Sequence, residues 1–286
     1  MDCCLISTNH LSESLWFRDD EDFKVGMNYV ALVVGSTGVR MLSFILMSNH
    51  VHFVVECRIK EAEEFINIFK RRYSQYFSRK YGSRKLLKRN SIDIRTVPFE
   101  KESVERAIAY VQMNSVAANI CLSSTQYPWG TGDCFFSGAE HKGISARSLS
   151  AEAKRRITHS HDIVPDHYVF NEDYILPSSY VEVDFVEALF RTPKRMHYFL
   201  VNSSKAKNVH SMAEAHLPSF RDQSLVAIIP DLCLSLFNST TPEALSDGNK
   251  SILIKEISRR FSADISQICR VMGMERAEVI NLLEAF

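Results

Sequence analysis

The sequence predicts an α+β fold: a ferredoxin-like antiparallel sheet with helices on one face, followed by a mainly helical C-terminal region. Three observations lead to this prediction. Segments with strand and helix patterns follow one another over residues 4–120 as strand, helix, two strands, helix, strand and helix. Only Ser48 and Asn49 separate the two consecutive strands, which favours a tight hairpin and so an antiparallel pair. After residue 246 the apolar spacing is helical.

Local patterns justify each element in turn. Residues 4–9 have a strand pattern, and residues 20–36 form a helix that Asp19 or Asp20 can cap. The helix after the hairpin has Gly82 as a plausible C-cap, and the last helix begins with acidic residues, as the helix dipole prefers. The remaining expected elements are strands at 38–48, 50–56 and 92–99 and a long helix at 100–120.

The hairpin contains two histidines, His50 and His52, with Val51 between them. Side chains alternate across a strand, so both imidazoles point to one face and Val51 points to the other. Two neutral imidazoles at this spacing can form a pair of metal ligands. The alternative is that both lie on the solvated face of the sheet. A complete metal site also needs a third ligand, which must come from elsewhere in the chain.

The helix after the hairpin lies in a strongly basic segment. Aromatic residues recur every four positions from Phe65 to Tyr81, and such a stripe is expected to pack on the sheet. There is no acidic residue between Phe65 and Ile92. Cations without carboxylates repel one another unless a polyanion binds, which favours nucleic acid over a merely solvated face. The candidate DNA-binding residues are Lys70, Arg71, Arg72, Arg79, Lys80, Arg84, Lys85, Lys88 and Arg89.

The helix at 100–120 offers two further candidate groups. Val104, Ile108 and Val111 form its apolar stripe, while Tyr110 and Asn114 lie four residues apart on a flank of the helix. Tyr110 carries a phenol, and Asn114 offers a neutral oxygen that can bind a hard divalent cation. Taken alone, a helical tyrosine is more often an ordinary packing residue.

Composition narrows the class of protein. The chain has 286 residues and a formal net charge of zero, so a basic surface requires segregated charge. Its seven scattered cysteines include no CxxC pair, which predicts reduced thiols in the cytoplasm. No apolar stretch approaches the roughly 18 residues of a membrane span. We therefore expect a cytoplasmic protein without a membrane partner.

Four segments resemble a known family. They are "LWFRDDEDF", "FILMSNHVHFVVE", "FKRRYSQYFSRKYG" and "AYVQMNSVAANICLSSTQYPWGT". Together they look like the single-tyrosine HUH transposases, especially the REP-associated tyrosine transposases. The resemblance runs from about Cys3 to Thr131. Departures from the family pattern are Ser48 and Ser115, which stand where proline is usual, and Gly130-Thr131, which stand where two serines are common.

The resemblance implies a role for each matching residue. His50 and His52 match the two metal ligands of the HUH pair, Asn114 matches the third ligand, and Tyr110 matches the nucleophile. A bound Mg²⁺ or Mn²⁺ would polarise the scissile phosphate. Tyr110 would attack it and form a covalent 5′-phosphotyrosine intermediate. The implied protein is a metal-dependent endonuclease and strand transferase acting on single-stranded, hairpin-associated DNA. The alternative is a domesticated DNA-binding regulator on the same fold without turnover.

The resemblance ends before the C-terminal half of the chain. We expect a nuclease domain at 1–135, a linker with short helices at 136–245, and a helix-turn-helix-like three-helix segment at 246–286 with a turn at Gly273. A small helical bundle that only packs on the nuclease is the alternative for the last segment. The stretch "THSHDIVPDH" at 158–167 has residues that could bind metal, but a surface loop is expected there. Monomer and homodimer both stay open.

Overall fold

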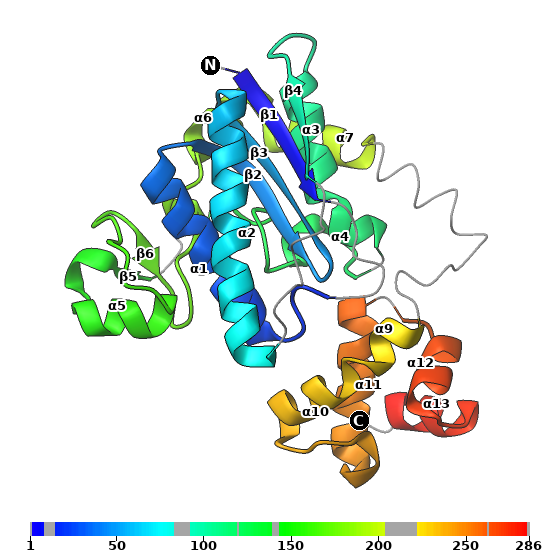
Figure 1. The fold of residues 1–286 in the computed structure, drawn as a ribbon. Coiled ribbons are helices and arrows are strands. Elements are labelled where there is room, and N and C mark those ends of the chain that lie inside the picture. The colour runs from blue at the N-terminus through cyan, green and yellow to red at the C-terminus, as the bar shows by residue number, and fades with distance from the viewer. Residues whose placement is uncertain are drawn as a thin grey trace.

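The computed structural model describes residues 2–8, 15–82, 92–118, 120–138, 143–203, 222–261 and 263–284, with residue 224 described by its backbone alone. Figure 1 shows a sheet covered by helices, a lobe beside it and a helical group at the C-terminal end. The elements up to residue 118 are β1 (Asp2–Thr8), α1 (Asp20–Thr37), β2 (Arg40–Met47), β3 (His50–Cys57), α2 (Ile59–Tyr81), β4 (Ile92–Val97), α3 (Ser103–Gln112) and α4 (Asn114–Ala117). They are followed by β5 (Ile144–Ser145), α5 (Ala151–Thr158), β6 (Val169–Phe170), α6 (Val183–Phe190), α7 (Pro193–Val201), α9 (Asp222–Val226), α10 (Ile229–Phe237), α11 (Asp247–Phe261), α12 (Ile265–Met272) and α13 (Arg276–Glu284). Short 3₁₀ turns lie at Ser124–Gln126, Ala146–Ser148, Pro177–Ser179 and Pro242–Ala244.

The first four strands form one antiparallel sheet in the order β2-β3-β1-β4. Strand β1 pairs with both β3 and β4, and β2 pairs with β3 across the Ser48–Asn49 turn. This confirms the predicted α+β fold and the hairpin. It also makes β3 an inner strand, held by β2 on one side and by β1 on the other.

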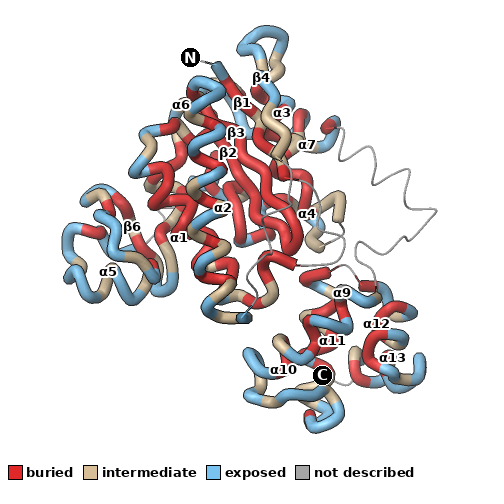
Figure 2. Tube along the Cα trace, in the orientation of Figure 1, coloured by how far each residue is buried: buried red, intermediate tan, exposed pale blue. Residues whose placement is uncertain are grey.

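Helices cover both faces of this sheet, so the prediction of helices on one face is wrong. On one face, the ring of Phe53 packs on Phe65 and Phe69 of α2, with centroids 5.1 and 5.5 Å apart. On the other face, His52 packs against Tyr110 of α3. The reason is that β2 is buried from Met41 to Met47 and β3 from His50 to Val55, so side chains on both faces need cover. Figure 1 shows α2 in front of the sheet, and Figure 2 shows the strands β2 and β3 as buried.

The aromatic stripe of α2 forms part of the core, as predicted. Phe65, Phe69, Tyr73 and Phe77 are completely buried against the sheet and α1. The helix ends at Gly82, whose left-handed conformation (φ 68°) and N–H bond to Ser78 make it the predicted C-cap. Asp19 caps α1 by accepting a bond from the backbone N–H of Asp22.

A buried carboxylate ties the start of α1 to the end of α2. Asp22 is completely buried and accepts hydrogen bonds from the hydroxyls of Tyr76 and Tyr81, at 2.9 and 2.8 Å, and from the ammonium of Lys80 at 2.9 Å. Burial raises the pKa of Asp22, and Lys80 acts in the opposite direction. The carboxylate therefore depends on these three donors, together with the backbone N–H of Arg18 at 2.8 Å, to stay in the core.

The last predicted helix of this region is two helices, α3 and α4, divided at Met113. The Asn114 side chain donates to the backbone oxygens of Tyr110 and Val111, at 2.9 and 3.1 Å. An asparagine that bonds the preceding turn in this way competes with the regular helical pattern. We attribute the division of the helix to this residue.

Residues 143–203 pack on the sheet rather than only linking two ends of the chain. Val181 bridges Met41 at the edge of β2, and Glu182 N–H donates to the oxygen of Met41 at 2.9 Å. Arg195 of α7 pairs with Glu102 before α3 at 2.8 Å. Part of this region therefore shares the core of the sheet, through residues such as Phe170, Ile175, Tyr180, Phe190 and Phe199.

Residues 129–131 cover the same edge of β2. Gly130 bridges Ile45, and a side chain at Gly130 would lie 2.6 Å from the backbone oxygen of Phe44. Only glycine, which has no Cβ atom, allows the backbone at residue 130 to lie this close to the backbone of β2.

The helices from α9 to α13 have a core of their own. It includes Leu225, Leu232, Ile254, Ile268 and Val279. The three predicted helices after residue 246 and the turn at Gly273 (φ 65°) are confirmed. Leu225, Leu232 and Leu245, which precede residue 246, belong to this core as well.

The C-terminal helices contact the sheet end near the hairpin. The buried Arg260 pairs with Asp20 at 2.9 Å, and its backbone oxygen accepts a bond from the Ser48 hydroxyl at 3.3 Å. Arg18 pairs with Asp231.

Within the described residues no helix is both long and apolar enough to cross a membrane.

We predict that Asp22→Ala lowers the free energy of unfolding by about 3 kcal/mol, because Tyr76, Tyr81 and Lys80 lose a buried acceptor. Urea titration followed by circular dichroism measures this loss. The matched control is the exposed neighbour Glu21→Ala, whose pair with Lys80 at 3.6 Å is partly solvated and should contribute less than about 1 kcal/mol. Equal effects of the two variants would contradict the structural role of Asp22.

Candidate active site

Strand β3 places His50 and His52 together on the face covered by α3. The centroids of the two rings are 4.9 Å apart and the rings are nearly perpendicular, at 84°. His50 is 5% and His52 4% exposed, so the alternative of a solvated face is wrong. Buried polar rings need hydrogen-bonding or ligand partners, which makes this pair the first candidate for function.

The Nδ1 atom of each histidine is held by a neighbouring side chain. His50 Nδ1 lies 2.6 Å from Oδ1 of Asn49, and His52 Nδ1 lies 2.9 Å from the hydroxyl of Ser7 on β1. An amide oxygen only accepts, so His50 Nδ1 carries the proton and the lone pair of the neutral ring is on Nε2. A ring held through Nδ1–H in this way is oriented as in metal-binding histidines.

The sequence interpretation did not assign roles to Asn49 and Ser7. Asn49 is the neighbour of His50 in the turn, and Ser7 faces His52 across the β1–β3 pairing. The strand register needed to recognise Ser7 is not evident from the sequence. Each of the two side chains contacts an imidazole at its Nδ1 atom.

Tyr110 reaches the same face from α3. Its ring centroid is 5.6 Å from that of His52, and the two rings are nearly perpendicular at 83°. The side chain is half-buried against the core. The structure therefore brings together His50, His52 and Tyr110, as the sequence predicted.

Two charged residues of β4, Asp93 and Arg95, influence the pKa of the Tyr110 hydroxyl. Burial raises the pKa of Tyr110, Arg95 acts to lower it, and Asp93 raises it. Arg95 and Asp93 also pair with each other at 2.6 Å. Asp93 is opposite Ser7 in the β1–β4 pairing, which places it near the histidine face. Arg95 is thus a cation beside the candidate nucleophile that sequence reasoning missed, because β4 joins the sheet next to β1 and not next to β3.

Asn114 is buried and is the first residue of α4, four positions after Tyr110. Its amide nitrogen is used in the bonds to the Tyr110 and Val111 backbone oxygens, so its oxygen is the end that could serve as a ligand. The donor set of two imidazoles and one amide oxygen suits a divalent metal completed by water. No group of three or more His, Cys, Asp or Glu residues in the described ranges could hold a metal ion, so Asn114 is needed for a third protein ligand. The "THSHDIVPDH" stretch accordingly forms no metal cluster among those residues.

Two of the predicted DNA-binding cations have carboxylate partners from distant parts of the chain. Lys80 pairs with Asp19 at 2.7 Å and with Asp22, and Arg72 pairs with Asp162. The expectation that these cations lack partners is wrong for both residues. Arg71 and Arg79 are exposed, and Lys70 is partly buried, which lowers its pKa. Arg84, Lys85, Lys88 and Arg89 lie outside the described residues.

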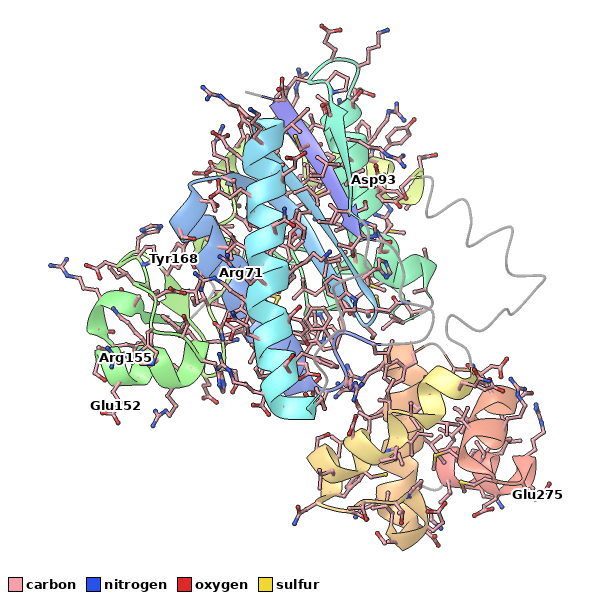
Figure 3. The ribbon with its side chains drawn as sticks, in the orientation of Figure 1. Arg71, Asp93, Glu152, Arg155, Tyr168 and Glu275 are labelled. Carbon is pink, nitrogen blue, oxygen red and sulfur yellow. The ribbon has the colours of Figure 1, made fainter. Side chains whose placement is uncertain are left out.

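The tyrosines of α2 are anchored in the fold, so they are unsuited to stack on bases. Tyr73 donates to the backbone oxygen of Trp16, and the hydroxyls of Tyr76 and Tyr81 donate to Asp22. The helix also lies on the opposite face of the sheet from His52 and Tyr110. The basic face of α2 and the histidine pair are therefore separate surfaces, and in Figure 3 Arg71 and Asp93 lie on different sides of α2.

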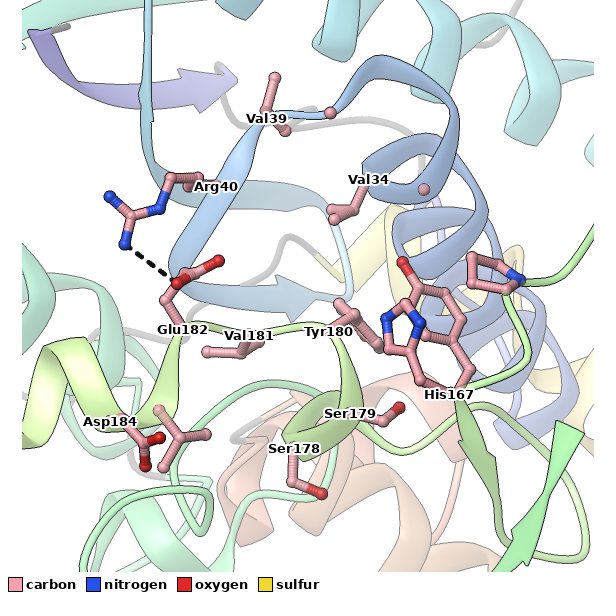
Figure 4. Close-up of a pocket in the computed structure, with 15 residues that line it drawn as sticks. Val34, Val39, Arg40, His167, Ser178, Ser179, Tyr180, Val181, Glu182 and Asp184 are labelled. Atoms are coloured by element: carbon pink, nitrogen blue, oxygen red, sulfur yellow. Dashed lines mark hydrogen bonds and ion pairs between the residues drawn. The ribbon is translucent and has the colours of Figure 1, made fainter.

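A cavity of about 500 Å³ lies at the far end of α1 from Asp22. Figure 4 shows Arg40, His167, Ser178, Tyr180 and Glu182 around it, with Arg40 bonded to Glu182 at 3.0 Å. None of the sequence-predicted site residues lines this cavity.

All seven cysteines, which lie in the described ranges, are free thiols, as predicted.

Comparisons with known proteins leave the family open. No family model matches the sequence, and no curated protein matches it. The chain is similar to a solved structure of a REP-associated tyrosine transposase bound to a REP hairpin, with 10% identity over 46% of this chain and 76% of that chain, at a TM-score of 0.35. A TM-score this low does not establish a common fold, so the case for a function rests on the geometry of the site.

We predict that Arg95→Gln raises the pKa of Tyr110, because a neighbouring cation stabilises the phenolate and its loss disfavours it. The rising limb of the pH profile of any activity that needs the phenolate should move to higher pH, and added salt should reduce the difference between variant and wild type. NMR titration of ¹³Cζ-labelled tyrosine, assigned with Tyr110→Phe, measures the change. Arg106→Gln, an exposed substitution on α3 itself, is the control, and equal shifts in both variants would contradict the role of Arg95.

Proposed function

We propose that His50, His52, Tyr110 and Asn114 form the active site of a metal-dependent single-stranded DNA endonuclease and strand transferase. The observation that carries the proposal is the 5.6 Å contact between the rings of His52 and Tyr110, which joins a candidate ligand on β3 to a candidate nucleophile on α3. We infer that the β-α-β-β-α-β order and the strand order β2-β3-β1-β4 correspond to the ferredoxin-like arrangement of HUH nucleases.

The residues present fit a divalent metal, Mg²⁺ or Mn²⁺. Nε2 of His50, Nε2 of His52 and Oδ1 of Asn114 would hold it, with water completing the shell. When bound, the metal supplies Lewis-acid polarisation of the scissile phosphate. Asn49 and Ser7 would keep the two imidazoles oriented toward it.

Tyr110 would act as the nucleophile. Its phenol loses a proton, its oxygen forms a bond to phosphorus, and the bond to the 3′-oxygen breaks while that oxygen takes up a proton. The 5′-phosphate stays on Tyr110, so a later 3′-hydroxyl can reverse the step and join another strand. Since burial raises the pKa of Tyr110, Arg95 would support the ionised form.

A single-stranded or hairpin DNA is the proposed partner, and a cytoplasmic location goes with it. Exposed Arg71 and Arg79 could contact phosphates, but on the face of the sheet away from Tyr110. The nuclease domain at 1–135 and a DNA-reading role for the helices at 246–286 remain part of the same proposal. The oligomeric state, monomer or homodimer, stays open.

A DNA-binding regulator without turnover is the second candidate. The observation that favours it is the half-buried position of Tyr110, whose burial raises its pKa and so disfavours the phenolate. Such a protein would bind a hairpin but form no covalent adduct. The following experiments distinguish the two candidates.

Tyr110→Phe removes one oxygen and keeps the ring, so the protein should fold and bind DNA as before. With hairpin-bearing single-stranded oligonucleotides and Mn²⁺, the wild type should give a covalent protein–DNA band and the variant none. Mass spectrometry should place the nucleotide on the peptide that contains Tyr110. An adduct on Tyr127, whose hydroxyl is buried and bonded to the oxygen of Leu46, would contradict the assignment. Tight hairpin binding without any adduct would favour the regulator.

His52→Ala should reduce adduct formation by at least a hundredfold and weaken Mn²⁺ binding, because one of three protein ligands is lost. Isothermal titration with Mn²⁺ measures the second effect without any need for cleavage. Ser7→Ala, which removes only the bond to His52 Nδ1, should weaken metal binding about tenfold. Unchanged Mn²⁺ affinity in His52→Ala would remove the metal site from the proposal.

A further inference from the structure

A second cavity, of about 490 Å³, lies between α2 and the turn that follows α5. It is away from the histidine face, because α2 covers the opposite face of the sheet. In Figure 3 Arg71 lies at the edge of α2 nearer the lobe that contains α5. The cavity is lined by Tyr29, Arg71, Arg72, Gln75, Arg79, His159, Ser160, His161 and Asp162.

The charged groups of this lining have an excess of positive charge. Three guanidinium groups face one carboxylate, that of Asp162, which bonds Arg72. The Arg72 partner lowers the pKa of Asp162. Arg71 and Arg79 are exposed and stand two helical turns apart, about 12 Å along α2, with Gln75 midway between them. Arg71, Gln75 and Arg79 thus offer N–H donors to the cavity. Asp162 is bonded to Arg72, so the positive charges of Arg71 and Arg79 are not balanced by this carboxylate.

The opposite wall of the cavity is held in a fixed conformation. His159 caps α5 in the left-handed region (φ 51°), which is uncommon outside glycine, and its ring packs edge-on against Tyr76 with centroids 6.2 Å apart. The Ser160 hydroxyl accepts a bond from Asp162 N–H at 3.2 Å and donates one to its carboxylate at 2.7 Å. A strained backbone that its surroundings hold in place is common at ligand sites.

The floor of the cavity is neutral. Tyr29 of α1 is 5% exposed, and burial raises the pKa of its hydroxyl, while Arg79 and Arg72 act in the opposite direction. Tyr29, Arg72 and Arg79 all line the same cavity. A neutral hydroxyl among cations adds hydrogen bonding without cancelling their charge.

We propose that this cavity binds the phosphate group of a nucleotide, either free or within a single DNA strand. Guanidinium groups match phosphate oxygens with paired N–H donors, and the volume falls in the range of sites that take a small organic ligand. The site uses residues 159–162, which lie beyond the family-like segment. It is separate from Tyr110, so a phosphate bound here is not the one proposed to be cleaved.

The test measures equilibrium binding and so does not depend on cleavage. Wild-type protein is titrated with deoxyadenosine 5′-monophosphate and with a short oligonucleotide that has a 5′-hydroxyl. Arg71→Gln and Arg79→Gln should each weaken binding of the preferred probe about tenfold. Arg147→Gln removes an exposed arginine that does not line the cavity, and should leave binding unchanged.

If the wild type binds the mononucleotide, and if Arg71→Gln and Arg79→Gln weaken this binding, the ligand is a free nucleotide. The same losses with the oligonucleotide alone would support a phosphate within a strand. The proposal is overturned if the wild type binds neither probe, or if the two cavity variants bind as tightly as Arg147→Gln. Circular dichroism of each variant checks that the fold is retained.

Discussion

The burial of β3 on both faces is the constraint on which the rest of the structure depends. One face presents Phe53 to the aromatic stripe of α2, and the other presents His50 and His52 to α3. Polar rings can be buried in an inner strand only if neighbours satisfy them, which is the role of Asn49 and Ser7. The same strand thus contributes side chains to the apolar core and to the polar site. A shift of β3 relative to its neighbours would therefore disturb both.

The position of Tyr110 reflects two opposed requirements. A side chain that approaches His52 from α3 must be partly buried, and burial raises its pKa. The half-buried edge strand β4 brings Arg95 to the same face, and this cation partly offsets the rise in the Tyr110 pKa. Lys80 and Asp22 show the same balance elsewhere, since a carboxylate that burial would neutralise is kept in place by a lysine and two tyrosines.

Local patterns predicted much of the fold and the centre of the site. Periodicity and capping residues identified α1, α2, the hairpin and the turn at Gly273, and alternation placed His50 and His52 on one face. The partners that depend on tertiary contacts could not be predicted: Asp22 lies 58 residues before Lys80, and Asp162 lies 90 residues after Arg72. The apolar run "FILM" in β2 was a missed signal, because a strand without alternation is typically buried on both faces. The metal and the DNA partner remain predictions.

The covered edge of β2 limits how this sheet could grow. Gly130 and Val181 each bridge β2, so its outer backbone groups are already partly used within the chain. An incoming strand from another molecule would have to displace these segments. The opposite edge is β4, where the charged pair of Asp93 and Arg95 would have to be accommodated. Edge-to-edge aggregation is discouraged by such devices, and the sheet therefore resists open-ended assembly at both of its margins.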